Sequence, residues 1–251
     1  MTNSEMLTIV QSQLASALNC TVADLNGEKD SLVFVEAKEN LGPLLPVPRG
    51  RQYFGMLTMG KAIIVTATPA RLKYAREHIT GKSRDDAFSV PFICGHSLFY
   101  LPDLDNLRYL PAPNGFLYEI AAENEIPKLR EAEGFNNAIQ YDLDHPYQNT
   151  LVMVARQGEA IAAIAGSGTR AAHCSKMWAI GVDVLPEYRN RGLAAYLVNA
   201  LAMEILRRDV VPYYGTSSSN IASQKVAHRA GFMPAWMCDH KVRFEGELSN
   251  S

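Results

Sequence analysis

The sequence predicts an α/β fold in two parts, a smaller N-terminal domain over residues 1–114 and a larger domain over residues 115–251. In the second part, apolar runs with a period of two alternate with segments of helical periodicity, which indicates strands followed by helices. Between the parts, residues 109–115 read Y-L-P-A-P-N-G, and prolines with Asn-Gly mark a boundary. Strand–helix alternation after a meander predicts a mixed sheet with helices on both faces.

The N-terminal part alternates helices and strands. Apolar residues one turn apart predict a helix over residues 4–18, and Pro69, which suits a first helical position, opens a helix to residue 79. The remaining predictions are a short helix at 21–26, a strand at 31–37, and a hairpin of 53–59 and 61–68 joined at Gly60. Residues 89–101 have a mixed apolar pattern, and no element is assigned to them.

The second part shows the clearer alternation. Period-two runs predict strands, and the two short runs around Gln157-Gly158-Glu159 predict a hairpin. The predicted strands are 116–121, 151–156, 160–166, 176–184, 210–216 and 232–243. The predicted helices are 123–131, 136–141, a long one from about residue 192, and 220–230, which Gly231 ends as a C-cap.

Residues 178–206 form the stretch around which this part is organised, and they read as a strand, a tight turn and a long helix. Pro186 cannot donate to a sheet and therefore ends the strand. Apolar residues recur every four positions along the helix, which gives it one apolar stripe: Leu193, Leu197, Leu201 and Ile205.

The turn over residues 189–194 has the features of an anion site. The first N–H groups of a helix lack intrahelical partners and lie at the positive end of its dipole. Gly192 removes a Cβ where a ligand approaches the backbone, while Arg189 and Arg191 add donors suited to phosphate oxygens. The turn lacks the three glycines of a dinucleotide site, and no Gly-Lys-Ser/Thr of a P-loop follows.

This stretch, V-x-V-x-P-x-Y-R-N-R-G-L-A, resembles the acetyl-CoA signature of the GCN5-related N-acetyltransferase (GNAT) superfamily, whose core pattern is Gln/Arg-x-x-Gly-x-Gly/Ala. Arg189, Gly192 and Ala194 fill its three fixed positions. The likeness covers roughly residues 115–243, and a looser likeness exists to the bacterial branch that includes zwittermicin A resistance acetyltransferases.

A second segment at the expected distance supports the resemblance. Family members commonly have an Asn, a small residue three positions later, and Gly-Phe eleven and twelve positions later. Here these positions hold Asn220, Ser223, Gly231 and Phe232.

The resemblance implies a sheet that splays between strands 178–184 and 210–216, with acetyl-CoA, a co-substrate, bound in the gap. Val182, Asp183 and Val184 are then expected to present backbone groups to the pantetheine arm, and one of their N–H groups to polarise the thioester carbonyl. Asn220 is expected to reach the arm, with Ser223 near it. The residues expected to offer N–H groups to the pyrophosphate are Asn190, Arg191, Gly192, Leu193, Ala194 and Ala195.

The resemblance leaves the general acid and base without assigned residues. The usual Tyr, seven positions after the Asn, is Ala227 here, and a Glu base of some members is Trp178. Asp183, an acid in an apolar strand, is a candidate for the base or for binding the acceptor's ammonium, and equally for a structural hydrogen bond. Tyr213 and Tyr214 on the facing strand are candidate acids, or core packing.

The implied function is acetyl-CoA-dependent transfer of an acetyl group to a primary amine of a small molecule, by direct attack on the thioester. Two alternatives remain, a non-catalytic acyl-CoA-binding sensor module and a protein N-acetyltransferase. The N-terminal domain of residues 1–114 is expected to cover the acceptor side, because the second part resembles a complete catalytic domain.

The composition limits which binding partners and which cellular location we expect for the protein. A formal net charge of −2 gives no reason to expect a nucleic acid or a membrane as partner. Four scattered cysteines without a Cys-x-x-Cys pair argue against a metal site or disulfide framework and favour the cytoplasm. We expect no signal peptide and no membrane span. The oligomeric state stays open, a homodimer included.

Overall fold

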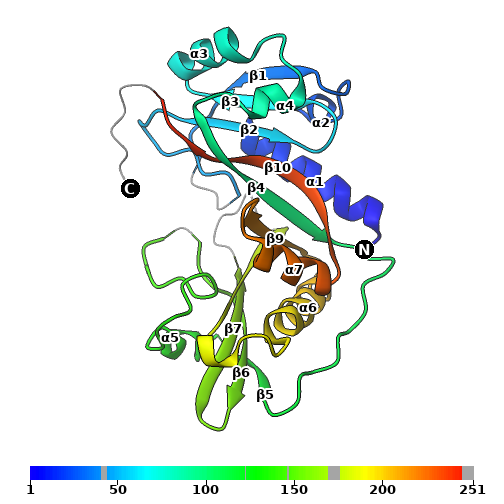
Figure 1. Ribbon diagram of the computed structural model, residues 1–251, viewed down its shortest axis with the longest axis vertical. Coiled ribbons are helices and arrows are strands. Elements are labelled where there is room, and N and C mark those ends of the chain that lie inside the picture. The colour runs from blue at the N-terminus through cyan, green and yellow to red at the C-terminus, as the bar shows by residue number, and fades with distance from the viewer. Residues whose placement is uncertain (41–43, 122, 146, 169–175, 245–251) are drawn as a thin grey trace. The chain divides into compact units, whose positions relative to one another are not determined.

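The computed structural model describes residues 1–251 except 41–43, 122, 146, 169–175 and 245–251. It confirms a mixed α/β fold, drawn in Figure 1. The described chain falls into two compact units, the first made of Met1–Ile9, Tyr100–Gly215 and Ile221–Met233, the second of Val10–Phe99, Thr216–Asn220 and Pro234–Ser251. The domain boundary expected at residue 114 stays a prediction, since compactness does not test whether residues 1–114 fold alone.

The second unit contains a sheet with the strand order β1-β3-β2-β10-β4. Its strands are β1 Leu32–Glu36, β2 Phe54–Thr58, β3 Ile63–Ala67, β4 Ile93–Pro102 and β10 Phe232–Val242. The helices of this part of the chain are α1 Asn3–Leu18, α2 Val22–Leu25, α3 Pro69–Ile79 and α4 Arg84–Phe88. The predicted helices at 4–18, 21–26 and 69–79, the strand at 31–37 and the hairpin at Gly60 are confirmed. Residues 89–101, which the sequence left unassigned, contribute most of β4.

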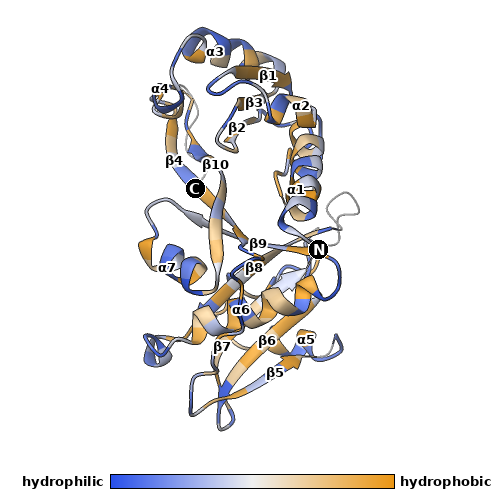
Figure 2. Cartoon of the chain, turned by 90° about the vertical axis from the view of Figure 1, so that its right-hand side faces the viewer, coloured by the Kyte–Doolittle hydropathy of each residue, from blue (hydrophilic) through white to orange (hydrophobic). Residues whose placement is uncertain are grey.

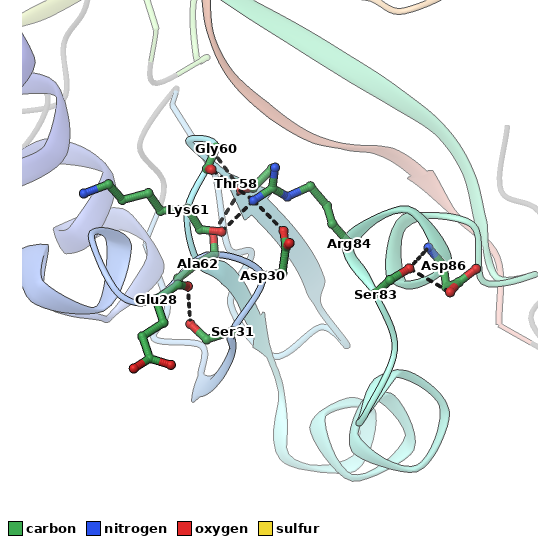
Figure 3. Close-up of polar contacts among 10 residues, drawn as sticks. All are labelled: Glu28, Asp30, Ser31, Thr58, Gly60, Lys61, Ala62, Ser83, Arg84 and Asp86. Atoms are coloured by element: carbon green, nitrogen blue, oxygen red, sulfur yellow. Dashed lines mark hydrogen bonds and ion pairs between the residues drawn. The ribbon is translucent and has the colours of Figure 1, made fainter.

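Arg84 ties α4 to the β2–β3 hairpin, as Figure 3 shows. Its Nη2 donates to the carbonyl oxygens of Gly60 at 3.0 Å and Lys61 at 2.8 Å, and it pairs with the Asp30 carboxylate at 2.7 Å. Gly60 has a φ of +91°, which glycine adopts at little cost. One guanidinium therefore closes the hairpin turn and holds the loop before β1 against it.

The first unit contains the strand order β9-β8-β7-β6-β5. Its strands are β5 Leu117–Ala121, β6 Leu151–Gln157, β7 Ala160–Gly168, β8 Met177–Val184 and β9 Val211–Ser217. Its helical segments are α5 Ile126–Leu129, the short 3-10 turn η2 Pro186–Tyr188, α6 Leu193–Leu206 and α7 Ile221–Arg229. Strands β5 to β8 pair antiparallel with their neighbours, and β8 pairs with β9 in parallel.

Two layers cover the sheet of the first unit. Helix α6 packs against β6, β7 and β8. A cluster around α5 buries Phe135, Ala138 and Ile139 with Val152 of β6 and Ile164 of β7. Strand β6 is hydrophobic along most of its length, as its colour in Figure 2 shows, because both of its faces are covered.

Two predicted helices of this unit are corrected. The helix expected over 123–131 is reduced to α5, whose flanking hydrogen bonds span three residues, as from Arg130 N–H to the Pro127 carbonyl. The short helix expected over 136–141 is a single turn. The N–H groups of Ala138 and Ile139 donate to the Phe135 carbonyl, but the Gln140 N–H donates to the Asn149 side chain, so helical bonding does not continue. None of the helices in the described part of the chain has the length and apolar character needed to span a bilayer.

Candidate active site

The pairing between β8 and β9 stops partway along both strands. Residues 177–179 of β8 pair with residues 211–213 of β9, and among the described residues no further pair joins these strands. On its other side β8 stays paired with β7 as far as Val184. Strand β8 therefore has an open edge beyond Ala179, at the place where the sequence led us to expect the sheet to splay.

The strand register identifies the backbone groups on this edge. The Leu185 N–H donates to the Ala162 carbonyl at 3.0 Å, and bonding alternates along an antiparallel pair. Asp183 therefore bonds to β7 through its backbone, while Val182 and Val184 turn theirs toward the open edge. The Val184 carbonyl accepts from Arg189 Nε at 3.2 Å. The Val182 N–H and carbonyl and the Val184 N–H are left on the edge.

The turn after β8 presents a row of N–H donors. Gly192 is the N-cap of α6 with a φ of +84°, no side chain caps the helix, and the first helical bond runs from Tyr196 N–H to the Gly192 carbonyl. In the described part of the chain, no acceptor is found for the N–H groups of residues 190–195. Asn190, with a φ of +62°, helps to turn the backbone here. These donors lie at the positive end of a helix, which favours an anion.

The two arginines of the turn are exposed, but each donates a hydrogen bond to a backbone carbonyl. Arg189 donates to Val184 as described, and Arg191 Nη2 donates to the Glu187 carbonyl at 3.3 Å. The Arg191 guanidinium carbon also lies 5.7 Å from the centre of the Tyr188 ring. Each guanidinium uses one donor in these contacts and has five, so most of its donors are still available.

Asp183 accepts three hydrogen bonds from the 135–140 segment. Its Oδ2 accepts from the backbone N–H of Asn137 at 2.7 Å and of Ala138 at 3.0 Å, and its Oδ1 accepts from Asn137 Nδ2 at 2.6 Å. A carboxylate offers about four acceptor positions, so most are in use. This geometry favours the structural hydrogen bond among the roles that the sequence left open, and a role as base stays a prediction.

The hydroxyl groups of buried Tyr214 and half-buried Ser223 form a pair. Tyr214 Oη lies 2.7 Å from Ser223 Oγ, which joins β9 to α7. Burial raises the pKa of Tyr214, the hydrogen bond with Ser223 opposes this, and the charge of Asp183 adds to it. The phenol therefore stays protonated at neutral pH and suits an acid rather than a base. The sequence expected Ser223 near the pantetheine arm but did not reveal this pairing.

The structure does not decide the roles of the other residues that the sequence analysis singled out. Tyr213 is buried beside Tyr214 in β9. Asn220 directly precedes α7, its N–H donates to the Ser217 carbonyl at 3.0 Å, and it belongs to the second unit, so its role stays a prediction. Ala227 is fully buried in α7. Trp178 Nε1 is buried and has no hydrogen-bond partner among the described residues.

No group of three or more His, Cys, Asp or Glu among the described residues is arranged to hold a metal ion. What the site offers is backbone N–H groups, two guanidinium groups and a buried phenol.

Comparison with known proteins identifies the segment that carries this geometry. Residues 115–232 match the family model described as Acetyltransferase (GNAT) family. No match to a curated protein was found. The likeness to the zwittermicin A branch stays a prediction.

Several solved structures resemble the chain. An acetyltransferase of the GNAT family from Colwellia psychrerythraea is 16% identical over 59% of this chain and 56% of that one, with a TM-score of 0.46. A GCN5-related N-acetyltransferase-like protein from Streptococcus suis is 16% identical over 84% and 80%, with a TM-score of 0.44. The yncA protein of Salmonella typhimurium, solved with acetyl-CoA, is 16% identical over 55% and 100%, with a TM-score of 0.38. The chain thus spans little more than half the length of the first of these.

Proposed function

Residues 115–232 belong to the GNAT acetyltransferase family, and from this premise we propose that the chain transfers the acetyl group of acetyl-CoA to a primary amine of a small molecule. The observation that carries the proposal is the row of N–H donors at residues 190–195, placed at the end of a strand whose edge is open. A phosphate group and an extended amide chain are the two kinds of ligand that such donors and such an edge would bind.

The residues present fit acetyl-CoA, which supplies the activated acetyl group when bound. The N–H groups of residues 190–195 would hold the pyrophosphate, with Arg189 and Arg191 adding charge. Gly192 suits this place because of its positive φ, while a Cβ there would meet Pro113 at an ordinary 3.6 Å. The Val182 N–H and carbonyl would pair with the amides of the pantetheine arm as a neighbouring strand does.

The chain's own groups would lower the barrier in two ways. An N–H of the open edge, at Val182 or Val184, would donate to the carbonyl oxygen as negative charge develops on it, and one such donor is typically worth about 100-fold or more. Tyr214, protonated because burial raises its pKa and paired with Ser223, would give a proton to the departing sulfur. The rest of the rate would come from holding both reactants together.

We also propose that the protein works in the cytoplasm. The cysteines in the described part of the chain, Cys20, Cys94 and Cys238, are free thiols. A reducing compartment is where such thiols persist, which supports the cytoplasm.

The test is release of free CoA from acetyl-CoA, followed with a thiol reagent, in the presence of four probe amines. The probes are alanine amide, 1,4-diaminobutane, kanamycin and a short lysine peptide. The proposal predicts saturable, amine-dependent release with at least one of the three small amines, and a rate with that amine above the rate with the peptide.

Two outcomes would contradict it. Tight binding of acetyl-CoA without release by any probe would favour the sensor module, for which the Ala227 and Trp178 positions already argue. A higher rate with the lysine peptide than with every small amine would favour a protein N-acetyltransferase.

A further inference from the structure

The segment of residues 135–140, here called the 135–140 loop, rests on two glycines of the sheet. Gly166 of β7 and Gly181 of β8 face each other in the strand register. A Cβ on Gly181 would overlap the backbone carbonyl of Asn137, and a Cβ on Gly166 would overlap that of Ala138. The loop backbone therefore lies closer to the sheet than any side-chain-bearing residue at these two positions permits.

Side chains from outside the loop fix it at both ends. Asp183, two residues after Gly181 and so on the same face of β8, accepts the three hydrogen bonds from Asn137 and Ala138. Asn149 Nδ2 donates to the Ala138 carbonyl at 2.9 Å, and its Oδ1 accepts from the Gln140 N–H at 2.7 Å. Two local bonds, from the Ala138 and Ile139 N–H groups to the Phe135 carbonyl, close the turn itself, and these distant side chains attach it to the sheet.

Buried apolar side chains also hold the loop against the sheet. Phe135, Ala138 and Ile139 are buried against Val154 and Ile164 of the sheet. Asn136 and Asn137 remain exposed at the turn. The loop is therefore held where it touches the sheet, and it exposes the side-chain amide of Asn136 at its tip, while that of Asn137 donates to Asp183.

The location of the loop decides what it can contact. It lies on the glycine face of β7 and β8, whereas the cluster it joins contains no residue of α6, which packs on this sheet from the other face. An acceptor at the open edge near Val182, on the face free of α6, would have this loop beside it. Asp183 is the residue that follows Val182, so it links the loop to the edge directly.

We propose that Asp183 is a positioning residue, which holds the 135–140 loop beside the open edge of β8 so that the loop orients the acceptor amine. This inference rests on the proposed function. The carboxylate acts through geometry, because its oxygens are hydrogen-bonded to the loop, and it does not take the proton of the amine.

Two substitutions at the same position separate this role from that of a base. Asp183→Asn can keep all three hydrogen bonds to the loop. Its carbonyl oxygen can accept both backbone N–H groups, and its NH₂ group can donate to Asn137 after that side-chain amide flips. Asp183→Ala loses all three bonds. A positioning role predicts that Asp183→Asn stays within about threefold of wild type, while Asp183→Ala loses about 100-fold in kcat/KM for the amine.

A third variant displaces the loop without touching an ionisable group. Gly181→Ala forces the Asn137 carbonyl away from the sheet and is expected to raise KM for the amine as Asp183→Ala does. Gly95→Ala is the matched control, since it places the same Cβ in a strand, β4, where the nearest atom lies at 3.8 Å. Neither variant should change the Kd for acetyl-CoA, measured by calorimetry.

The experiment uses the full chain, the small probe amine that gives the highest rate, and hydrogen exchange at the Asn137 amide, which donates to Asp183, whereas the Ala138 amide also donates to the Phe135 carbonyl. The expected result is fast exchange in Asp183→Ala, protection in Asp183→Asn, and an unchanged pH profile in Asp183→Asn. A loss of about 1,000-fold in Asp183→Asn with the Asn137 amide still protected would overturn the inference in favour of a base. Acetyl-CoA binding by wild type without turnover of any probe would instead overturn the proposed function itself.

Discussion

The turn at residues 189–195 and the 135–140 loop border the same strand, β8, but they are built in opposite ways. The turn leaves its backbone N–H groups without acceptors in the described structure, and its glycine meets nothing closer than 3.6 Å. The loop has its N–H groups taken by acceptors of its own chain, at Asp183, Asn149 and the Phe135 carbonyl, and lies on glycines that leave no room for a Cβ. One region is kept open for a ligand, and the other is closed by its own chain.

The difference shows where binding and where rigidity come from. Open donors at a helix end are a site for an anion. A loop whose donors are already satisfied has little left to bind with through its backbone, and contributes by holding its exposed side chains in place. The predictions below test this contrast, beginning with the largest expected effect.

The first prediction compares the same substitution in the two regions. Gly166→Ala drives a Cβ into the Ala138 backbone and is expected to lower the free energy of unfolding by about 3 kcal/mol. Gly192→Ala has room for its Cβ and should cost about 1 kcal/mol, from its positive φ. Urea denaturation of both variants measures the free energy of unfolding. Equal decreases in the two variants would contradict the difference between the loop and the turn.

The second prediction concerns the open side of β8. Tyr214→Phe removes the proposed acid and should lower kcat about 100-fold with acetyl-CoA binding unchanged. Because burial raises the pKa of Tyr214, the acid form persists as pH rises, so wild-type kcat should not fall until the pH exceeds the ordinary phenol pKa of about 10. A wild-type alkaline limb centred below that value would assign the acid to another group.

The third prediction concerns charge at the turn. Arg189→Met should raise the Kd for acetyl-CoA about tenfold, with a weaker salt dependence, because a charge-assisted donor to phosphate is lost. Arg207→Met, just past the other end of α6, is the control and should leave the Kd unchanged. Equal effects of the two changes would mean that overall charge, and not the turn, attracts the ligand.

The smallest expected effect lies in the loop. Asn137→Ala removes one of the three donors to Asp183 and leaves both backbone donors, so unfolding free energy should fall by about 1 kcal/mol. The Kd for acetyl-CoA should not change in calorimetry. A weakened Kd would show that the loop and the turn are not separate in function.

The sequence predicted the turn well and the loop poorly, for one physical reason. The strand, Gly192 and the striped helix are contiguous, so their signals lie within one short stretch. Asp183 and Asn137 are 46 residues apart, and their hydrogen bond overrides the local helical pattern that suggested a helix over 136–141. The Tyr214–Ser223 pair was missed similarly, since it depends on how β9 and α7 pack.

The central claim is that residues 190–195 bind the pyrophosphate of acetyl-CoA, and calorimetric titration of acetyl-CoA tests it most directly. Wild type should bind, Gly192→Glu should lose binding because it adds bulk and negative charge at the donors, and Gly158→Glu should bind as wild type does. Gly158 is the matched control, with a φ of +60° in a hairpin turn and nothing within 4 Å of its Cβ position. Equal binding by wild type and Gly192→Glu, or no binding by wild type, would contradict the account.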